Sequence, residues 1–346
     1  MTSRLPYSVH PTGWFHAYWA DELAPGDVVP LHYFGEDLVL FRLASGEVSI
    51  LDAYCPHQGA HLGYGGTVED EVLVCPFHGW TWNARGENCF IPNSSRSQMK
   101  VKARRWPVVE RNGVVYLWHD AAGGEPAWEV PEISQLASDE FYPVRPKHTR
   151  TWEEVPVHVQ MIVENTVDIG HFESIHHARG AAAVLAMEPG EHTFRAQLEM
   201  TYGGKKGTTW LTPKGPEAGG ADSTWYGLGF SVTSFDMGGS TGWVHVQAAT
   251  PIDDEYSRLW AAIAVPRPPG ADPAATEPED AMLARMVTSS LNQTEKDFPI
   301  WKHMRYRERV PLTPEEKEPL LTIRAWAHGF YPGAEPAPVT PTTERT

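Results

Sequence analysis

Residues 55–80 read CPHQGAHLGYGGTVEDEVLVCPFHGW, and they place one cysteine and one histidine in each of two short segments. Cys55 and His57 come first, and Cys75 and His78 follow after an interval rich in glycine and polar residues. Thiolates and imidazoles are the ligands that suit zinc, copper or an iron–sulfur cluster. The sequence therefore predicts a metal site between two loops, each of which contributes one ligand of each type.

The identity of the metal depends on how the four ligands are paired. Zinc accepts the same donors at a spacing of about two to four residues, but zinc fingers usually pair cysteine with cysteine and histidine with histidine. A Rieske [2Fe–2S] cluster carries two cysteines on one iron and two histidines on the other, so two loops around it can each give one of each. Pro56 and Pro76 fix φ after each cysteine, and the nearby glycines permit tight turns. The mixed pairs favour the cluster over zinc.

The arrangement C-x-H, then residues 58–74, then C-x-x-H resembles the cluster motif of the Rieske non-haem iron oxygenases. The resemblance implies that four residues bind a Rieske [2Fe–2S] cluster, namely Cys55, His57, Cys75 and His78. His61 and Cys89 lie outside the motif. We expect His61 to have no ligand role and Cys89 to be a small buried residue.

Short apolar runs that alternate with turn residues dominate the N-terminal part of the chain. Such runs are typical of antiparallel strands, and they span residues 28–34, 37–43, 47–54, 71–74 and 113–119. The following stretch is rich in glycine, proline and acids without periodicity, which is typical of a linker. We expect a Rieske domain at residues 1–120, a linker at 121–148, a catalytic domain at 149–331 and a disordered tail at 332–346.

The C-terminal part combines helical and strand signals. We expect a helical region over residues 156–177 and a long helix with a capping box at Thr276 and Glu279. The apolar stripe of this helix comprises Leu283, Val287 and Leu291. Aromatic-rich strands are expected at residues 193–202, 224–232 and 242–250. The fold class is α+β, and the family resemblance implies a helix-grip-like catalytic domain with an antiparallel sheet.

A second metal site is indicated by ENTVDIGHFESIHH at residues 164–177. Asp168 and His171 would share a helix face, whereas His171 and His176 would diverge by about 140° on a regular helix. The helix must therefore bend or carry a π-bulge near Gly170 if both imidazoles bind one metal. Two histidines and one carboxylate leave positions open on iron, and Asp297 is the candidate carboxylate. Pro299 implies a helix kink just past it, so a surface acid in a broken helix remains the alternative.

The same family resemblance extends to these residues. Its motif N-x-x-D-x-x-H-x4-H matches Asn165, Asp168, His171 and His176, and its late acid followed by an aromatic matches Asp297 and Trp301. The resemblance implies a mononuclear Fe(II) with three ligands, namely His171, His176 and Asp297. It makes Asn165 a supporting residue and Asp168 the catalytic electron bridge to the cluster of a neighbouring subunit, in a homotrimer.

Three segments are most similar to the oxygenase components of 3-ketosteroid 9α-hydroxylases and to the related sterol desaturases: 164–176, 297–303 and 324–331. This implies a monooxygenase that uses O2 to hydroxylate a bulky apolar, steroid-like substrate. The alternatives are an aromatic O- or N-demethylase or a dioxygenase of the same architecture and, in another class, a non-enzymatic electron carrier. Aromatic residues could line a cavity or form plain core, namely Trp210, Trp225, Tyr226, Phe230, Phe235 and Trp243.

Composition restricts the partners and the compartment. The chain has 346 residues, a formal net charge of −16 and three cysteines. The negative charge argues against nucleic acid and anionic membranes, and the cysteine count points to a reducing compartment. No glycine-rich dinucleotide fingerprint is present. We therefore expect a soluble cytoplasmic protein that receives NAD(P)H electrons through a separate flavin and iron–sulfur reductase or a ferredoxin.

Overall fold

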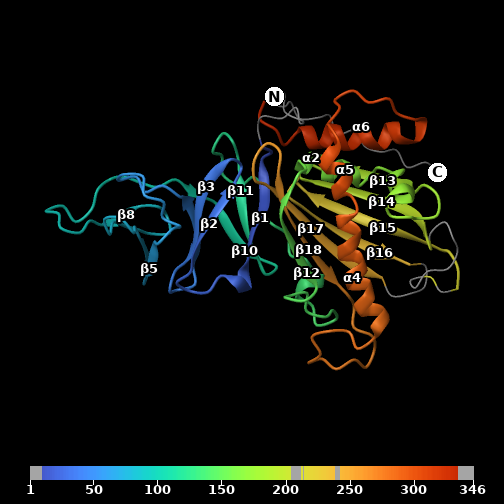
Figure 1. Ribbon diagram of the computed structural model, residues 1–346, viewed down its shortest axis with the longest axis horizontal. Helices are drawn as coiled ribbons and strands as arrows, with labels where there is room; N and C mark the ends of the chain where they lie inside the picture. Colours follow the sequence, from blue (N-terminus) through green and yellow to red (C-terminus); the bar gives the residue numbers. More distant parts are fainter. Residues whose placement is uncertain (1–9, 204–211, 213, 238–241, 334–346) are drawn as a thin grey trace.

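The computed structural model describes residues 10–203, 212, 214–237 and 242–333. Within these residues the chain forms four antiparallel sheets and several helices, with the small sheets at one end of the molecule and the large sheet at the other (Figure 1). The expected α+β fold class is confirmed. The tail expected to be disordered lies almost wholly outside the described residues. No described helix is both long and apolar enough to cross a membrane.

The N-terminal part contains three sheets. The first has the order β2-β3-β4-β9, with strands Val28–Tyr33, Glu36–Arg42, Val48–Asp52 and Arg105–Trp106. The second has the order β5-β6-β7-β8, with strands Thr67–Glu69, Val72–Val74, Thr81–Trp82 and Asn88–Phe90. The third has the order β1-β11-β10, with strands Gly13–Trp19, Val114–His119 and Val108–Arg111. The apolar runs of the sequence thus form β2, β3, β4, β6 and β11.

Strand β3 contributes side chains to two apolar clusters, one on each face of its sheet. Leu38 and Leu40 point into one apolar cluster, whereas Val39 and Phe41 point into another. Successive side chains of a strand face opposite sides of the sheet, so a continuous apolar run buries both faces. The second of these clusters also contains Cys55 and Cys75. The cluster loops therefore rest on the apolar core of the small domain.

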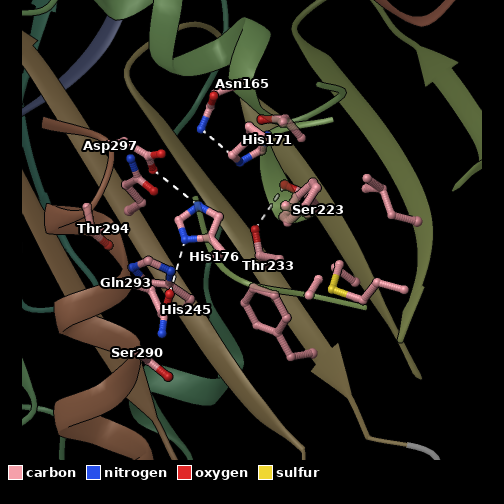
Figure 2. A pocket seen from close by; sticks show the side chains of 18 of the residues that line it. Asn165, His171, His176, Ser223, Thr233, His245, Ser290, Gln293, Thr294 and Asp297 are labelled. Carbon is pink, nitrogen blue, oxygen red and sulfur yellow. Dashed lines mark hydrogen bonds and ion pairs between the residues drawn. The ribbon is translucent and has the colours of Figure 1, made fainter. Parts of the chain in front are cut away.

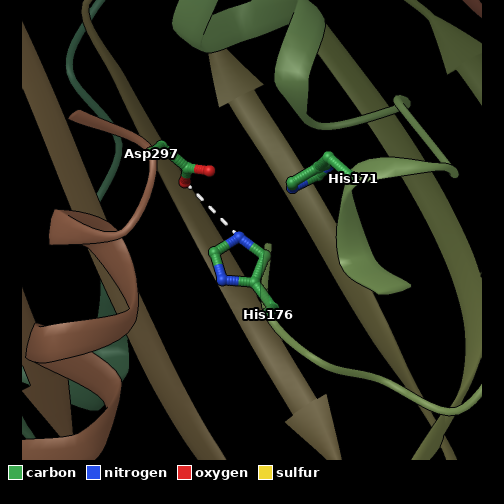
Figure 3. Close-up of side chains that lie close together, drawn as sticks. All are labelled: His171, His176 and Asp297. Carbon is green, nitrogen blue, oxygen red and sulfur yellow. Dashed lines mark ion pairs between the residues drawn. The ribbon is translucent and has the colours of Figure 1, made fainter. Parts of the chain in front are cut away.

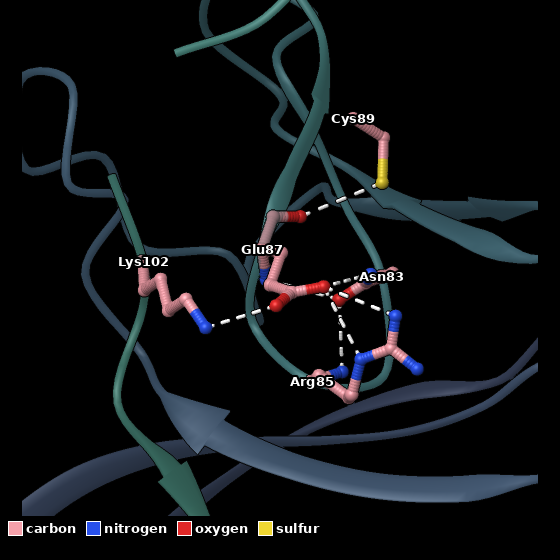
Figure 4. Close-up of polar contacts among 5 residues, drawn as sticks. All are labelled: Asn83, Arg85, Glu87, Cys89 and Lys102. Carbon is pink, nitrogen blue, oxygen red and sulfur yellow. Dashed lines mark hydrogen bonds and ion pairs between the residues drawn. The ribbon is translucent and has the colours of Figure 1, made fainter. Parts of the chain in front are cut away.

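A polar network closes the turn between β7 and β8 (Figure 4). The Glu87 carboxylate accepts hydrogen bonds from Lys102 at 2.9 Å, Asn83 at 3.0 Å and Arg85 at 3.2 Å. These bonds, that of Lys102 first, lower the pKa of Glu87 to about 2. Cys89 lies part-exposed beside this network, with its Sγ 3.5 Å from the Glu87 carbonyl oxygen. The expected burial of Cys89 is wrong, because its neighbour on β8 takes the buried face.

Residues 121–148 pack closely along the molecule. Trp128 accepts a hydrogen bond from the Trp14 indole at 2.7 Å through its carbonyl oxygen. Val130, Ile133 and Val144 are buried in the same apolar cluster as Trp14. One short helix, α1 (Ser134–Ala137), lies in this segment. The connection between the two parts of the chain is thus anchored at these buried residues, whereas residues 121–125 are exposed.

The C-terminal part is built on a seven-stranded sheet. Its order is β12-β18-β17-β16-β15-β14-β13, with strands Thr149–Val155, Ser257–Ala264, Trp243–Pro251, Phe230–Asp236, Glu217–Tyr226, Thr193–Tyr202 and Ala183–Pro189. Helix α4 (Ala281–Glu295) crosses one face of this sheet, and α6 (Pro314–His328) lies near α2 (Val159–Asn165) (Figure 1). Residues 224–232 do not form one strand. They form a hairpin, because Gly227 with φ 55° turns the chain.

Helix α4 begins later than expected. Its first amides are capped by Asp280, whose carboxylate accepts from the Leu283 N–H at 3.3 Å. The capping box at Thr276 and Glu279 is therefore wrong, since Pro278 disfavours helical geometry just before it and aspartate is a strong N-cap. The apolar stripe is confirmed, and three of its residues are buried, namely Leu283, Val287 and Leu291.

Candidate metal centres and their pocket

The two cysteine–histidine loops have the same backbone turn. The Gly59 N–H donates to the Cys55 carbonyl at 2.9 Å, and the Gly79 N–H donates to the Cys75 carbonyl at 3.0 Å. Gly59 has φ 76° and Gly79 has φ 68°, values that glycine adopts without strain. The repeated turn places each histidine near the tip of its loop, two or three residues after its cysteine.

The side chains of these loops fit a Rieske cluster. Cys55 and Cys75 are free thiols, only 2% and 3% exposed, and the His57 and His78 ring centroids lie 4.7 Å apart. Burial first, together with contact with Cys75, raises the pKa of the Cys55 thiol to about 11. Iron would supply the positive charge that two buried thiolates require. The donor set of two sulfurs and two imidazoles matches that cluster type.

A second group of ligand atoms gathers under α4. The His171, His176 and Asp297 ligand atoms all lie within 4.8 Å of one another (Figure 3). His176 Nε2 is 3.4 Å from Asp297 Oδ2, and Asp297 is only 7% exposed. A buried carboxylate beside two imidazoles is costly without a cation. Two nitrogens and one carboxylate are the donor set of mononuclear Fe(II) sites that keep positions open.

Helix ends bring these three residues together. His171 is the first residue of α3 (His171–Ser174), and His176 follows after the helix has ended. The expected bend is therefore a helix end, with no π-bulge in this described stretch. Asp168 lies in the turn between α2 and α3, so the expectation that it shares a helix face with His171 is wrong.

Asp297 also lies at a helix boundary. Helix α4 ends at Glu295, and Asp297 is the N-cap residue of α5 (Phe298–His303). The break expected just past the acid therefore comes before it. Pro299 sits in the first turn of α5, where the lack of an amide hydrogen removes no helical bond. The gap between the two helices turns the carboxylate toward His176.

Hydrogen bonds orient both imidazoles. His171 Nδ1 donates to the Asp168 carbonyl oxygen at 2.6 Å, and His176 Nδ1 donates to Gln293 Oε1 at 3.1 Å. Each ring then carries its lone pair on Nε2. Burial first, and then the proximity of His176, lowers the pKa of His171. Neutral imidazoles with a fixed tautomer are the form that binds metal.

Asn165 and Asp168 surround His171 in different ways. The Asn165 amide donates to His171 Nε2 at 3.2 Å, so it lies beside the atom that would bind iron. The exposed Asp168 carboxylate accepts from the backbone N–H groups of Gly170 at 3.1 Å and His171 at 3.4 Å. Contact between Asp168 and the His171 ring is thus made by the backbone carbonyl, and the carboxylate remains open to solvent.

The ligand group opens into a cavity of about 400 Å³ between α4 and the inner face of the sheet (Figure 2). Most of the wall is apolar, and three of the six singled-out aromatics line it, namely Trp225, Phe235 and Trp243. Phe230 belongs to the core between the two parts of the chain, and Tyr226 packs against it. Trp210 lies outside the described residues. Plain core was thus the right interpretation for only some of these aromatics.

Several polar lining residues escaped the sequence interpretation, among them Gln293 and His245. Gln293 bonds His176, and the sequence held a signal for it, since it lies only four residues before the candidate ligand Asp297. His245 lines the cavity from β17. The alternation of β17 places it on the same face as Trp243, but no motif separates it from a core histidine.

Comparison with known families covers most of the chain. Residues 13–107 match the Rieske [2Fe-2S] domain, and residues 117–331 match the 3-ketosteroid 9alpha-hydroxylase C-terminal domain. A 3-ketosteroid-9-alpha-monooxygenase oxygenase component of Rhodococcus rhodochrous is 30% identical over 332 residues, which cover 92% of this chain and 83% of that protein.

One further relative and one solved structure are similar over different extents. A cholesterol 7-desaturase of Ciona intestinalis is 37% identical over 197 residues, which cover 55% of this chain. The match spans only 41% of that desaturase, so the chain corresponds to less than half of it. The crystal structure of dicamba monooxygenase bound to 3,6-dichlorosalicylic acid has a TM-score of 0.71 at 18% identity, covering 91% of this chain and 95% of that one. It shares the fold.

Proposed function

Because the chain belongs to the Rieske non-haem iron oxygenases of the 3-ketosteroid 9α-hydroxylase type, we propose that it is the oxygenase component of a monooxygenase. Its substrate would be a bulky, largely apolar molecule of steroid-like size. One observation carries the proposal: two histidines and a buried carboxylate stand at the wall of a mainly apolar cavity. An electron carrier would need neither the carboxylate nor the cavity.

The proposed division of labour assigns the cluster to the domain at residues 1–120 and the mononuclear iron to the domain at 149–331, joined by 121–148. Cys55, His57, Cys75 and His78 would hold the cluster, and His171, His176 and Asp297 would hold Fe(II). When bound, these groups supply O2 activation and electron delivery. Each hydroxylation consumes a C–H bond, O2, two electrons and two protons, and yields an alcohol and water.

The chain's own residues hold the substrate and exclude water. Leu198, Met200 and Trp225 contribute an apolar wall opposite α4, which favours substrates with large hydrocarbon surfaces. Gln293 and the Asp168 carbonyl keep the Nε2 atoms of both histidines directed inward. Together these contacts hold a hydrophobic molecule beside the ligand group without any charged partner.

The partners we propose are a separate reductase or ferredoxin and two further copies of the chain in a homotrimer. The strands next to the cluster loops lie at the far end of the molecule from α4 (Figure 1). Large aromatic side chains are exposed around those loops, with Tyr64 at 70% and Phe77 at 61%. Exposed apolar groups of this kind favour docking of another protein surface. Asp168 is exposed and would meet a neighbour's cluster loop as the electron bridge.

The test is low-temperature EPR of the dithionite-reduced, anaerobically purified protein, together with iron and zinc quantitation. A rhombic signal with an average g of about 1.9 and about three irons per chain are expected. Zinc without that signal would refute the proposal. Turnover with a reductase then separates the chemistries, because hydroxylation retains all substrate carbons whereas demethylation releases formaldehyde.

A further inference from the structure

Three strands of the large sheet each place one polar residue at the same level of the cavity floor. Ser223 on β15 pairs with Thr233 on β16, and Thr233 pairs with His245 on β17. All three line the cavity (Figure 2), and the Thr233 hydroxyl donates to the Ser223 hydroxyl at 2.9 Å. We call these residues the polar row. It crosses an inner sheet face that is otherwise largely apolar.

The polar row separates the ligand group from an apolar end of the cavity. At the next level of pairing, Phe235 lies opposite Trp243, and their rings stack at 4.8 Å. Trp243 packs in one cluster with Met286 of α4. Met286 lies on α4 nine residues before the helix ends at Glu295, a distance of roughly 13 Å along the helix. A molecule that reached from the ligand group to this end would pass over the polar row.

His245 has an unmet hydrogen-bonding capacity. Its Nε2 is buried and has no hydrogen-bond partner among the described residues, while part of the ring faces the cavity. Burial lowers the pKa of His245 to about 4, so the ring is neutral at pH 7. A neutral imidazole offers one donor and one acceptor. The buried Nε2 is closed to the cavity, so the part of the ring that lines the cavity is what a bound molecule can meet.

The charge of the cavity restricts that partner. Lys296 is the one lysine or arginine among the described residues that line it, and it is partly exposed and adjoins Asp297 in the chain, at the ligand group. A neutral His245 cannot compensate a buried carboxylate, whose desolvation would be costly without a cation. A hydroxyl or a carbonyl requires only a hydrogen bond, which the ring can accept or donate.

We propose that the polar row binds an uncharged oxygen of the substrate, a hydroxyl or a carbonyl, with His245 as the anchoring group. This inference rests on the proposed function, because the molecule held is the oxygenase substrate. The substrate class is a neutral, largely apolar molecule with one such oxygen. Its hydrocarbon remainder packs against Phe235 and Trp243, and the carbon to be oxidised lies on the Asp297 side of that oxygen.

The test compares steroids that share a skeleton and differ in oxygen. Equilibrium dialysis under anaerobic conditions, with both metals loaded, gives the Kd of androstenedione, androstenediol and the hydrocarbon androstane. His245→Phe keeps ring size and removes both nitrogens, whereas His245→Gln keeps a hydrogen-bonding group. His328→Phe, at an exposed position on α6, is the matched control.

Of the two oxygenated steroids, the one that wild-type protein binds more tightly should bind about tenfold more weakly to His245→Phe, as expected for one lost hydrogen bond. Androstane should bind within about twofold of its wild-type affinity, and His245→Gln and His328→Phe should stay close to wild type for every probe. Tighter binding of the diketone would identify a carbonyl as the partner of His245, and tighter binding of the diol would identify a hydroxyl. Equal weakening for androstane, or no weakening at all, would overturn the proposal.

Two further results keep the test decisive. If His245→Phe loses its cluster absorption, the isosteric Thr233→Val replaces it and should weaken the oxygenated steroid alone by about threefold. If no steroid binds to wild-type protein that contains both metals, the substrate class is wrong. The oxygenase assignment is judged separately, by the EPR signal and the iron content.

Discussion

The cluster loops take all four candidate ligands from residues 55–78, whereas the candidate mononuclear site combines His171 and His176 with Asp297 from a distant part of the chain. In the first region, one turn repeated around Gly59 and Gly79 positions every ligand. In the second, two helix ends on opposite sides of the cavity must meet. The difference teaches that local backbone chemistry is sufficient for the cluster loops, while the iron site depends on the packing of the whole catalytic part.

The two regions differ also in how far the protein prepares them for metal. The Cys55 thiol is buried and its pKa is raised to about 11, so without metal the sulfur of Cys55 is protonated, the form that does not bind metal. At the second site, Asp168 and Gln293 already hold the lone pairs of both imidazoles inward. Metal must therefore shift a protonation equilibrium in the first region, and it meets a largely preformed site in the second.

The largest effect is expected for a change at Asp297, which should abolish the mononuclear site and leave the cluster loops intact. Asp297→Ala removes the only carboxylate of the ligand group, so the protein should lose its mononuclear iron and all turnover. The Rieske EPR signal should remain at wild-type intensity, because no contact of the cluster loops is altered. Iron quantitation should fall from about three to about two per chain.

The reciprocal variant is the matched control. Cys75→Ser should lose the Rieske signal and keep the mononuclear iron. Loss of both signals in either variant would contradict the assignment of two separate sites.

The same contrast explains what could be predicted from the sequence. The ligands of the cluster loops follow a local motif, and the strands around them follow from apolar alternation in runs such as 37–43. Gly227 could have indicated a turn, but the aromatic residues on both sides of it favoured one continuous strand. The hairpin was therefore not predicted. Asp280 replaced the expected cap Thr276, which lies four residues earlier, because Pro278 disfavours helical geometry at the residue before it.

The iron site was harder to predict because its geometry depends on contacts across the fold. The i to i+5 spacing of His171 and His176 indicated an irregularity but could not tell a bend from a helix end. Which side chain would support each histidine also depended on tertiary packing, since Gln293 reaches His176 from another helix. His245 faces the cavity only because β17 pairs in one register with β16.

A smaller effect concerns the connection between the two regions. Asp168→Asn keeps the shape of the side chain and its backbone carbonyl, which holds His171. Both metals should therefore remain, whereas turnover coupled to reductase oxidation should nearly disappear, because the proposed charged bridge to a neighbouring cluster would be lost. Normal steady-state rates in this variant, with full metal content, would refute the bridge. A sedimentation measurement checks that the oligomeric state is unchanged.

The smallest effect tests whether the iron site is preformed. Gln293→Leu removes the acceptor for His176 Nδ1–H while keeping an apolar side chain of similar size. The ring should then sample the other tautomer and other orientations, so Fe(II) affinity in chelator competition should weaken by about tenfold. Gln293→Glu retains an acceptor oxygen and should stay within about threefold of wild type, with the Rieske signal unchanged in both variants. Equal iron affinity in Gln293→Leu and wild type would mean that Asp297 and the packing around α3 orient His176 without Gln293. The evidence that the second site is preformed would then come from the Asp168 carbonyl alone.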